Sequence, residues 1–281
     1  MKCYLIGYPV AHSMSPYMHN AGFDKLDLDL SYKIVPIKPE ELERFVEEEM
    51  RADVFRGGNV TIPHKVSVTG YLDELDETAY IIGAVNTIVK EGENLKGYNT
   101  DGYGALRALR ESYGDLEGVI AVMIGAGGAA RAIGYSLSTL ARSIKMYNRT
   151  LRHAEELVRQ LSATDEGIST VSAHPLSDLK KAESLADVDI LINATPVGMP
   201  PYQEETPIDA DLLHPDLLVF DIVYNPVKTR LLKDAVNCGA QVIPGYRMLV
   251  YQGVRAFELW TGVKAPEGLM MRVVEEKLGL H

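Results

Sequence analysis

Cysteine is scarce in this chain. Cys3 and Cys238 are the only two cysteines among 281 residues, and no C-x-x-C spacing is present. A disulfide framework or a cysteine-based zinc site is therefore not expected. We expect both thiols to be reduced, as in a cytoplasmic protein.

Long apolar runs and an excess of positive charge are also missing. No stretch of about 18 apolar residues occurs and the first residues read directly as a strand, so we expect neither a membrane span nor a secretion signal. The 28 Lys and Arg residues against 39 Asp and Glu residues give a net charge of -11, which opposes nonspecific binding to nucleic acid or anionic membranes. The 281 residues, 46% of them hydrophobic, suffice for two packed domains, and one large domain is the alternative.

Strand and helix patterns alternate along the chain. The first hundred residues contain strand patterns at 2–8, 30–37, 57–62 and 86–92, and one acidic-faced helix pattern at 39–50. After a helix at 100–114 come a strand, a glycine turn and a helix within 118–137, strands at 143–148, 167–172, 188–194, 217–224 and 241–244, and helices at 152–161 and 229–239. This alternation predicts an α/β fold with a mostly parallel sheet, helices on both faces and ligands at the carboxyl ends of the strands.

The last part of the chain predicts two amphipathic helices, at 247–262 and 267–279, which need a surface to cover. We expect these helices to return to the first domain. The predicted division is therefore a first domain of residues 1–101 and 246–281 and a nucleotide-type domain of residues 102–245.

A glycine-rich turn follows the strand predicted near residue 120. Gly125, Gly127 and Ala130 form a G-x-G-x-x-A pattern between a strand and a helix. The first glycine allows a tight turn, the second lets the backbone approach a pyrophosphate, and the helix N-terminus favours that anion. A glycine turn that binds nothing is the alternative, but the strand–turn–helix context favours a Rossmann-type dinucleotide site.

The end of the next strand bears on the choice between NADP and NAD. Asn148, Arg149, Thr150 and Arg152 stand where an NAD site usually carries a carboxylate for the ribose 2′-OH. Two guanidinium groups suit a 2′-phosphate, at about 1.5 to 3 kcal/mol for each charged hydrogen bond, and predict a preference for NADP. In the alternative, the arginines are solvated and Thr150 only caps the next helix, although Thr150 could do both.

Two later strand ends are candidates for contact with the nicotinamide half of the cofactor. They are the segments 193–199 and 221–226. Either segment is explained equally well as an ordinary loop turn that contacts no ligand. Their position at the ligand-binding ends of strands favours cofactor contact.

Short segments of the first hundred residues carry polar side chains that a plain core would not contain. These side chains are Ser13, Ser15, Asn59, Thr61, Lys65, Asn86, Asn99, Thr100 and Asp101. Hydroxyls and amides at strand and turn ends suit a ligand rich in hydroxyl groups, such as a sugar-like polyol acid. If the fold joins Lys65 to Asp101, the ammonium can donate a proton to a carbonyl as hydride arrives while the carboxylate orients it. A surface salt bridge is the alternative.

Three histidines lie among these segments, at His12, His19 and His64. They lack Cys or carboxylate partners at metal-ligand spacing, so we expect no metal site. We expect these histidines to hydrogen-bond the backbone instead.

Eight sequence motifs follow one another from Gly7 to Trp260. In chain order they are G-x-P-x-x-H-S-x-S-P (Gly7 to Pro16), N-V-T-x-P-x-K (Asn59 to Lys65), G-A-x-N-T (Gly83 to Thr87), N-T-D-G (Asn99 to Gly102), G-A-G-G-A-A-R-A (Gly125 to Ala132), N-R-T (Asn148 to Thr150), N-A-T-P-x-G-M (Asn193 to Met199), and a tail with Gly245, Met248, Leu249, Gln252, Ala256, Phe257 and Trp260. Each motif alone is modest evidence. In series they resemble the shikimate dehydrogenase family.

The resemblance implies an N-terminal α/β substrate domain, a Rossmann-type doubly wound NADP-binding domain, and C-terminal helices that return to the first domain. It implies an enzyme that reduces 3-dehydroshikimate to shikimate with NADPH, in aromatic amino-acid biosynthesis. The expected partner is thus a small molecule, and the oligomeric state stays open between a monomer and a homodimer.

The resemblance also assigns roles to residues. Lys65 and Asp101 would be the catalytic pair, with Lys65 the proton donor and acceptor. The substrate would be bound by Ser13, Ser15, Thr61, Lys65, Asn86, Asp101, Tyr224 and Gln252. The cofactor would be bound by Gly125, Ala126, Gly127, Gly128, Ala129, Asn148, Arg149, Thr150, Arg152, Thr195, Ile222 and Gly245.

Two departures from the family pattern are Tyr8, where Asn is common, and Arg152, where Lys is common. The first bears on the shape of the substrate site, and the second keeps the charge that NADP needs. The rival readings are a quinate/shikimate dehydrogenase that uses NAD, which Arg149 and Arg152 disfavour, and a catalytically silent ligand sensor, which Lys65 and Asp101 disfavour.

Ser13 and Ser15 precede a predicted helix. Read locally, Ser15 is its N-cap and Pro16 its first residue, which leaves Ser13 unexplained. With the rest of the site placed, both hydroxyls indicate an anion at a helix N-terminus, where the helix dipole and free N–H groups favour a carboxylate.

Overall fold

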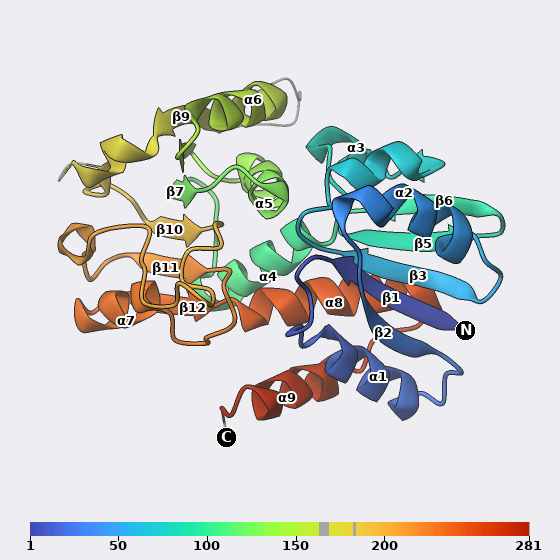
Figure 1. The fold of residues 1–281 in the computed structure, drawn as a ribbon. Coiled ribbons are helices and arrows are strands. Elements are labelled where there is room, and N and C mark those ends of the chain that lie inside the picture. The colour runs from blue at the N-terminus through green and yellow to red at the C-terminus, as the bar shows by residue number, and fades with distance from the viewer. Residues whose placement is uncertain (163–168, 182–183, 281) are drawn as a thin grey trace. The chain divides into compact units, whose positions relative to one another are not determined.

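The structure is a computed structural model that describes residues 1–162, 169–181 and 184–280 (Figure 1). The chain divides into two compact units, Met1–Gly104 with Leu249–His281, and Ala105–Met248. It passes from the first unit to the second within helix α4 (Asp101–Tyr113) and returns within helix α8 (Tyr246–Thr261). None of the described helices combines the length and apolar character that crossing a membrane requires.

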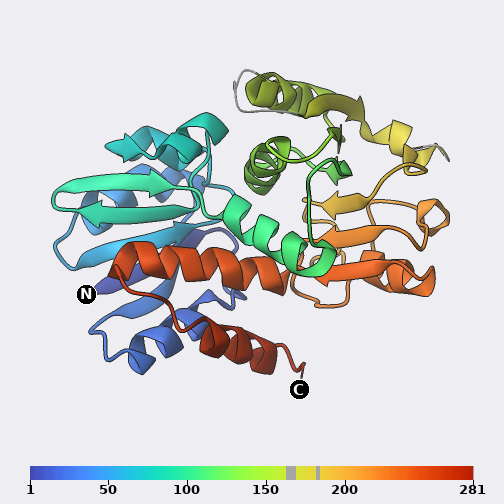
Figure 2. The same ribbon diagram turned by 180° about the vertical axis from the view of Figure 1, so that it is seen from behind.

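The first unit contains a six-stranded mixed sheet in the order β2-β1-β3-β5-β6-β4. Its strands are β1 (Lys2–Gly7), β2 (Ser31–Pro36), β3 (Phe55–Val60), β4 (Glu74–Leu75), β5 (Thr87–Glu91) and β6 (Asn94–Tyr98). Strand β5 runs antiparallel to both neighbours, and it joins β6 in a hairpin in which Glu91 pairs with Asn94 across a two-residue turn. The β5–β6 hairpin is visible in teal in Figure 2. The parallel sheet expected from the alternating pattern is therefore that of the second unit.

Helices cover both faces of this first sheet. They are α1 (Ser15–Lys25), α2 (Leu42–Phe45), α3 (Glu77–Ile82), α8 and α9 (Glu267–Lys277), with short helical turns at Pro39–Glu41, Val46–Met50 and Ser67–Tyr71. Tyr4, Ile6 and Val60 pack with Leu42 and Val46 on one face. On the other face α1 lies beside α9, and the indole of Trp260 donates to the backbone oxygen of Ile88 at 2.9 Å.

The prediction of one regular helix at 39–50 is wrong. It consists of a 3-10 turn, one turn of α-helix and a π-helical turn. The apolar residues Leu42, Val46 and Met50 are all buried, so the predicted core-facing stripe is right although the hydrogen-bond spacing changes along it.

The second unit contains an all-parallel sheet in the order β12-β11-β10-β7-β8-β9. Its strands are β7 (Ile120–Ile124), β8 (Ser143–Asn148), β9 (Thr170–Pro175), β10 (Ile190–Asn193), β11 (Leu218–Asp221) and β12 (Gln241–Pro244). Its helices are α5 (Gly128–Ser138), α6 (Leu151–Ser162) and α7 (Arg230–Asn237), with 3-10 turns at Leu176–Lys180 and Ala210–Leu212. The first two residues of the strand predicted at 167–172 lie outside the described residues.

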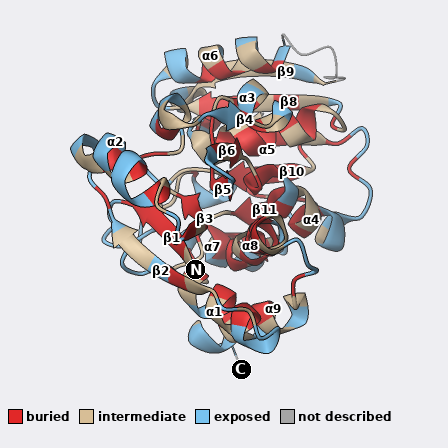
Figure 3. Cartoon of the chain, turned by 90° about the vertical axis from the view of Figure 1, so that its right-hand side faces the viewer, coloured by how far each residue is buried: buried red, intermediate tan, exposed pale blue. Residues whose placement is uncertain are grey.

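Alternate side chains of each parallel strand enter opposite halves of the core. Met123 and Met146 lie near Gly134 of α5 and Leu161 of α6, whereas Val122 and Ile124 pack in the cluster that contains Leu231 of α7. The strands are largely buried in Figure 3. The strand order reverses between β7 and β10, so the doubly wound sheet has its switch point there, where such folds bind ligands.

Candidate active site

The structure joins Lys65 and Asp101. Lys65 lies in the turn after β3 and Asp101 begins α4, and their Nζ and Oδ2 atoms are 2.5 Å apart. The two side chains are only 15% and 5% exposed, so this is not the exposed surface salt bridge weighed as the alternative. A partly buried ammonium held by a carboxylate is a group that can hold or move a proton.

Asn86 contacts the other oxygen of this carboxylate and is itself held by Thr100. The Nδ2 atom of Asn86 donates to Asp101 Oδ1 at 2.9 Å and to Thr100 Oγ1 at 2.9 Å. The carbonyl of the Asn86 side chain accepts the backbone N–H of Thr100 at 2.7 Å, which fixes which end of the amide faces the carboxylate. Gln252 of α8 completes the group, since its Oε1 lies 3.2 Å from Asn86 Nδ2.

Thr61 follows β3 and lies against Gly7 at the end of β1. In the sequence Thr61 lies between Asn59, which is buried in the sheet, and Lys65. Hydrogen bonds within this unit therefore bring together Lys65, Asn86, Asp101 and Gln252. Thr61 lies in the segment after β3 that also carries Lys65.

Ser13 and Ser15 lie at the start of α1, and the predicted N-cap is wrong. The helix begins at Ser15 and its N-cap is Met14, which provides no side-chain hydrogen bond. Ser13 Oγ accepts the backbone N–H of Ser15 at 3.2 Å and lies 3.2 Å from Ser15 Oγ. Ser13, and not the expected Ser15, thus provides the side-chain oxygen that accepts a backbone N–H at this helix start. The hydroxyls of the two serines lie close together.

Thr87 is a buried polar residue of this group that the sequence reasoning did not single out. Its Oγ1 donates to Asn86 Oδ1 at 3.0 Å and accepts from Asn59 Nδ2 at 3.1 Å. A signal was present, because Asn-Thr pairs occur at both 86–87 and 99–100. The two dipeptides are brought together by the pairing of strands β3, β5 and β6, which the sequence alone does not show.

The glycine turn of the second unit has the backbone that its pattern predicts. Gly125 has φ of +113°, and a Cβ there would collide with the backbone of Ala194 after β10. A Cβ at Gly127 would meet no atom within 4 Å. Helix α5 starts at Gly128 without a side-chain cap, so the turn presents free N–H groups beside open space.

The segment after β8 is exposed. Arg149 has no hydrogen-bond or ion-pair partner among the described residues, whereas Arg152 pairs with Glu156 at 2.8 Å. Asn148 Nδ2 donates to the backbone oxygen of Thr150 at 2.8 Å, which holds this turn. Of the two arginines, Arg149 is the one whose charge is available to a ligand.

Thr195 belongs to a closed network of polar side chains after β10. Its Oγ1 donates to Asn193 Oδ1 at 2.6 Å, and Asn193 Nδ2 donates to Asp221 Oδ1 at 2.9 Å. Asp221 also accepts the hydroxyl of Thr229 at 2.6 Å and the N–H of Val223 at 3.0 Å. Burial raises the pKa of Asp221 to about 6, although these donors oppose the rise.

Ile222, Tyr224 and Gly245 lie at the ends of neighbouring strands β11 and β12. A Cβ at Gly245 would collide with the backbone of Ile222, so the two strand ends can approach only with glycine there. Tyr224 belongs to the second unit, unlike the other residues expected to bind substrate.

The histidines have separate environments. His64 Nε2 contacts the backbone oxygen of Ile37 at 2.6 Å, as predicted, and His12 is exposed. The backbone hydrogen bond predicted for His19 is wrong, because neither of its ring nitrogens has a hydrogen-bond partner in the part of the chain that the structure describes. His19 stacks on Tyr32 with ring centroids 4.5 Å apart, and burial lowers its pKa to about 3.

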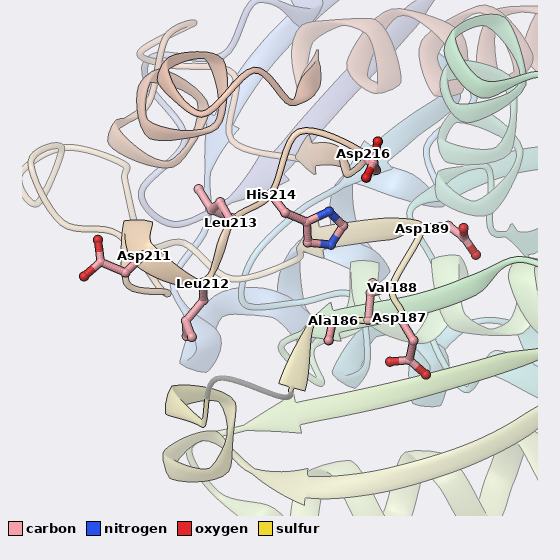
Figure 4. Close-up of a pocket in the computed structure, with 9 residues that line it drawn as sticks. All are labelled: Ala186, Asp187, Val188, Asp189, Asp211, Leu212, Leu213, His214 and Asp216. Carbon is pink, nitrogen blue, oxygen red and sulfur yellow. The ribbon is translucent and has the colours of Figure 1, made fainter.

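A pocket of about 570 Å³ lies at the opposite edge of the parallel sheet, beside the segments that precede β10 and β11 (Figure 4). Two of its four acidic residues already have partners: Asp189 accepts the N–H of Ile120 at 2.7 Å, and Asp187 pairs with Lys145 at 3.2 Å. The ring of His214 contacts the backbone oxygen of Leu185 at 3.0 Å. These contacts stabilise the loop structure and leave the carboxyl edge as the candidate site.

Three family models match successive parts of the chain. They describe a shikimate dehydrogenase substrate binding domain over residues 5–88, a shikimate/quinate 5-dehydrogenase over residues 107–226, and a shikimate 5′-dehydrogenase C-terminal domain over residues 245–275.

Whole-chain relatives agree with these models. The shikimate dehydrogenase (NADP(+)) of Methanopyrus kandleri is 47% identical over 277 residues, covering 98% of this chain and 94% of the relative. A crystal structure of a shikimate dehydrogenase in complex with NADP+ is 41% identical with a TM-score of 0.90, covering 99% of this chain and 95% of that one. The shikimate 5-dehydrogenase from Listeria monocytogenes, in complex with shikimate and NAD, is 37% identical with a TM-score of 0.87, covering 97% and 95%.

The parallel sheet with its glycine turn and the polar group of the first unit define an α/β protein of the oxidoreductase class. The chain belongs to the shikimate dehydrogenase family. The resemblance and the fold class predicted from the sequence are thereby confirmed.

Proposed function

We propose that this chain catalyses the reversible reduction of 3-dehydroshikimate to shikimate with NADPH. The observation that carries the proposal is the partly buried Lys65–Asp101 pair among amide and hydroxyl side chains. A hydroxylated ring acid needs such directional donors and acceptors. The relative that is 47% identical is named shikimate dehydrogenase (NADP(+)).

Lys65 is the proposed proton donor. In the direction of reduction its ammonium gives a proton to the substrate carbonyl oxygen, which becomes a hydroxyl, and in the reverse direction its amine takes that proton back. Asp101 contacts Nζ at 2.5 Å, so it orients the ammonium. NADPH supplies the hydride to the carbonyl carbon when it is bound.

Ser13 and Ser15 are proposed to bind the substrate carboxylate. Their hydroxyls lie 3.2 Å apart at the start of α1, where the N-cap residue Met14 supplies no side-chain hydrogen bond. Helix N–H groups and the dipole favour an anion at such an end. Thr61, Asn86 and Gln252 are the proposed contacts of the ring hydroxyls, and Tyr224 is proposed as a further substrate contact.

The second unit has residues that fit NADP. The open space at Gly127 and the uncapped N-terminus of α5 suit a pyrophosphate, and Arg149, unpaired among the described residues, suits a 2′-phosphate. Arg152 contributes charge while it pairs with Glu156. The proposed NADP contacts are Gly125, Ala126, Gly127, Gly128, Ala129, Asn148, Arg149, Thr150, Arg152, Thr195, Ile222 and Gly245.

A steady-state assay tests the proposal directly. Shikimate and quinate are each oxidised with NADP and with NAD, and the four kcat/KM values are compared. We expect shikimate with NADP to exceed the other pairs by at least about tenfold, equal to about 1.4 kcal/mol. Comparable rates with quinate and NAD would overturn the assignment.

A quinate/shikimate dehydrogenase that uses NAD is the second candidate. The matched family model describes both substrates, and the Listeria relative is recorded with NAD. Arg149, which has no partner in the part of the chain that the structure describes, favours NADP instead. A silent ligand sensor would show no turnover with any pair, and the retained Lys65–Asp101 contact speaks against it.

Location and assembly are further proposals. The thiols of Cys3 and Cys238 are free, which suits a reducing cytoplasm. Sedimentation at micromolar concentration would distinguish a monomer from the homodimer left open by the sequence. Each state gives a different mass, so the measurement decides between them.

A further inference from the structure

A line of buried polar side chains crosses the first sheet toward Asp101. Tyr32 lies on β2, Asn59 on β3 and Thr87 on β5, and each is at most 4% exposed. Asn59 and Thr87 are register partners across β3 and β5, so their side chains share one face of the sheet. The opposite face carries the cluster with Tyr4 and Val60.

Every hydrogen bond in this line can be donated in the same direction. Tyr32 Oη donates to Asn59 Oδ1 at 2.7 Å, and Asn59 Nδ2 donates to Thr87 Oγ1 at 3.1 Å. Thr87 Oγ1 then donates to Asn86 Oδ1 at 3.0 Å. Finally Asn86 Nδ2 donates to Asp101 Oδ1 at 2.9 Å. The chain of donors ends on the carboxylate that holds Lys65.

Such an arrangement has two physical consequences. Hydrogen bonds that point the same way polarise one another, so each donor strengthens the next, and a low-dielectric interior adds to the effect. The amide of Asn86 is also held with its NH₂ toward Asp101, because its oxygen receives Thr87 as well as Thr100. With Oδ1 occupied by Asn86, Oδ2 remains for the ammonium of Lys65.

We infer that Thr87, supported by Asn59 and Tyr32, is a positioning residue for Asp101 and through it for Lys65. The inference rests on the proposed function, because positioning matters only if this pair acts on the substrate. Thr87 lies within the sheet and its hydroxyl is saturated by protein groups. Its expected effect is therefore on kcat rather than on substrate binding.

Thr87→Val tests the inference because it keeps the shape and removes only the hydroxyl. We expect kcat for shikimate oxidation to fall about tenfold while KM changes less than threefold. Thr87→Ser restores the hydroxyl and is expected to keep kcat within twofold of the wild type. Thr261→Val is the matched control, since Thr261 donates to the backbone of Phe257 at 2.8 Å and has no part in the line.

The decisive measurement is a double-mutant cycle with Asp101→Asn. If Thr87 acts through Asp101, Thr87→Val should lower kcat less than twofold in the Asp101→Asn background. An equal tenfold loss in both backgrounds would mean a general structural effect and would overturn the inference. So would a Thr87→Val enzyme whose kcat stays within twofold of the wild type.

Tyr32→Phe decides the question if Thr87→Val does not fold. It removes the first donor of the line, and we expect a threefold loss of kcat that disappears in the Asp101→Asn background. A wild-type kcat in Tyr32→Phe would then overturn the inference. Tyr98→Phe is the control, because Tyr98 donates to the exposed Glu91 at 3.0 Å. Activity of the wild type with shikimate tests the proposed function separately. An inactive wild type would contradict the proposed function, whereas an active wild type with unaffected variants would contradict only the positioning role of Thr87.

Discussion

The candidate sites of the two units present different chemistry. In the first unit the candidate site is built from side chains that already bond one another, such as Asn86, Thr100 and Asp101. In the second unit the glycine turn presents backbone, at Gly125 and the uncapped start of α5, with Arg149 unpaired among the described residues. Side chains that bond one another, at Asn193, Thr195 and Asp221, lie in the second unit as well, at and after the ends of β10 and β11. A side-chain site thus depends on buried hydrogen bonds to hold its geometry, whereas a backbone site depends on the conformation of its turn.

The strongest test of the side-chain site is Lys65→Ala. Removal of the proton donor should lower kcat by about 10² to 10⁴, while NADPH affinity stays the same because the second unit is untouched. Steady-state kinetics and a fluorescence titration with NADPH measure the two quantities. Lys25→Ala, at an exposed position at the end of α1, is the control. A variant with near-normal kcat would remove Lys65 from the mechanism.

The second prediction concerns Asp221, the buried carboxylate of the second unit. Its pKa is about 6 in the folded protein against 3.8 for the ordinary group. Well below pH 3.8 the carboxyl is protonated in both states, and between pH 3.8 and 6 the unfolded chain ionises it while the folded state keeps it protonated. The wild type should therefore lose about 3 kcal/mol of unfolding free energy relative to Asp221→Asn between about pH 3 and pH 7.

Urea unfolding of both proteins at four pH values measures this difference. Because all other groups titrate alike in the two proteins, the difference isolates Asp221. A constant difference across the range would show that the three donors hold the carboxylate ionised in spite of its burial.

The third prediction tests whether the charge of Arg149, as distinct from the backbone of the glycine turn, determines the preference for NADP over NAD. Arg149→Ala should weaken NADP binding by about tenfold to a hundredfold, because one charged hydrogen bond to the 2′-phosphate is lost. NAD binding should change less than twofold. Arg142→Ala, exposed just before the other end of the same strand, is the control. Equal losses for NADP and NAD would contradict a role in recognising the 2′-phosphate.

The smallest expected effect is that of Ser13→Ala. KM for shikimate should rise about tenfold, since a hydrogen bond to a charged carboxylate contributes about 1.5 kcal/mol or more. The bond from Ser15 N–H to Ser13 Oγ is 3.2 Å long, so the free energy of unfolding should fall by less than about 1 kcal/mol. Thermal unfolding beside the kinetics checks both, with Ser31→Ala as control. A loss of stability with unchanged KM would leave Ser13 a purely structural role.

The sequence allowed prediction of what depends on local patterns. Strands β8 and β12 have the predicted bounds, since their apolar runs are closed by polar or glycine residues on both sides. The strand–glycine–helix turn at Gly125 is as expected, because no other residue type suits its φ of +113°. The short strand β4, the helix α3 and the strand β6 were not foreseen.

What depends on register could not be read from the sequence. The Asn59–Thr87 contact exists because β3 and β5 pair antiparallel with these two residues opposite each other. A slip of one residue would turn every side chain of a strand to the other face. For the same reason Lys65 and Asp101 were candidates for a pair but also for a surface salt bridge until the fold brought them together.

The start of α5 has one more consequence. A helix whose first N–H groups lack a side-chain cap is an incomplete element of secondary structure, and an anion bound there completes it. In the proposed function that anion is the pyrophosphate of NADP, so we expect the cofactor to raise the melting temperature by mass action as its concentration exceeds its Kd. We expect inorganic phosphate to compete for the same donors.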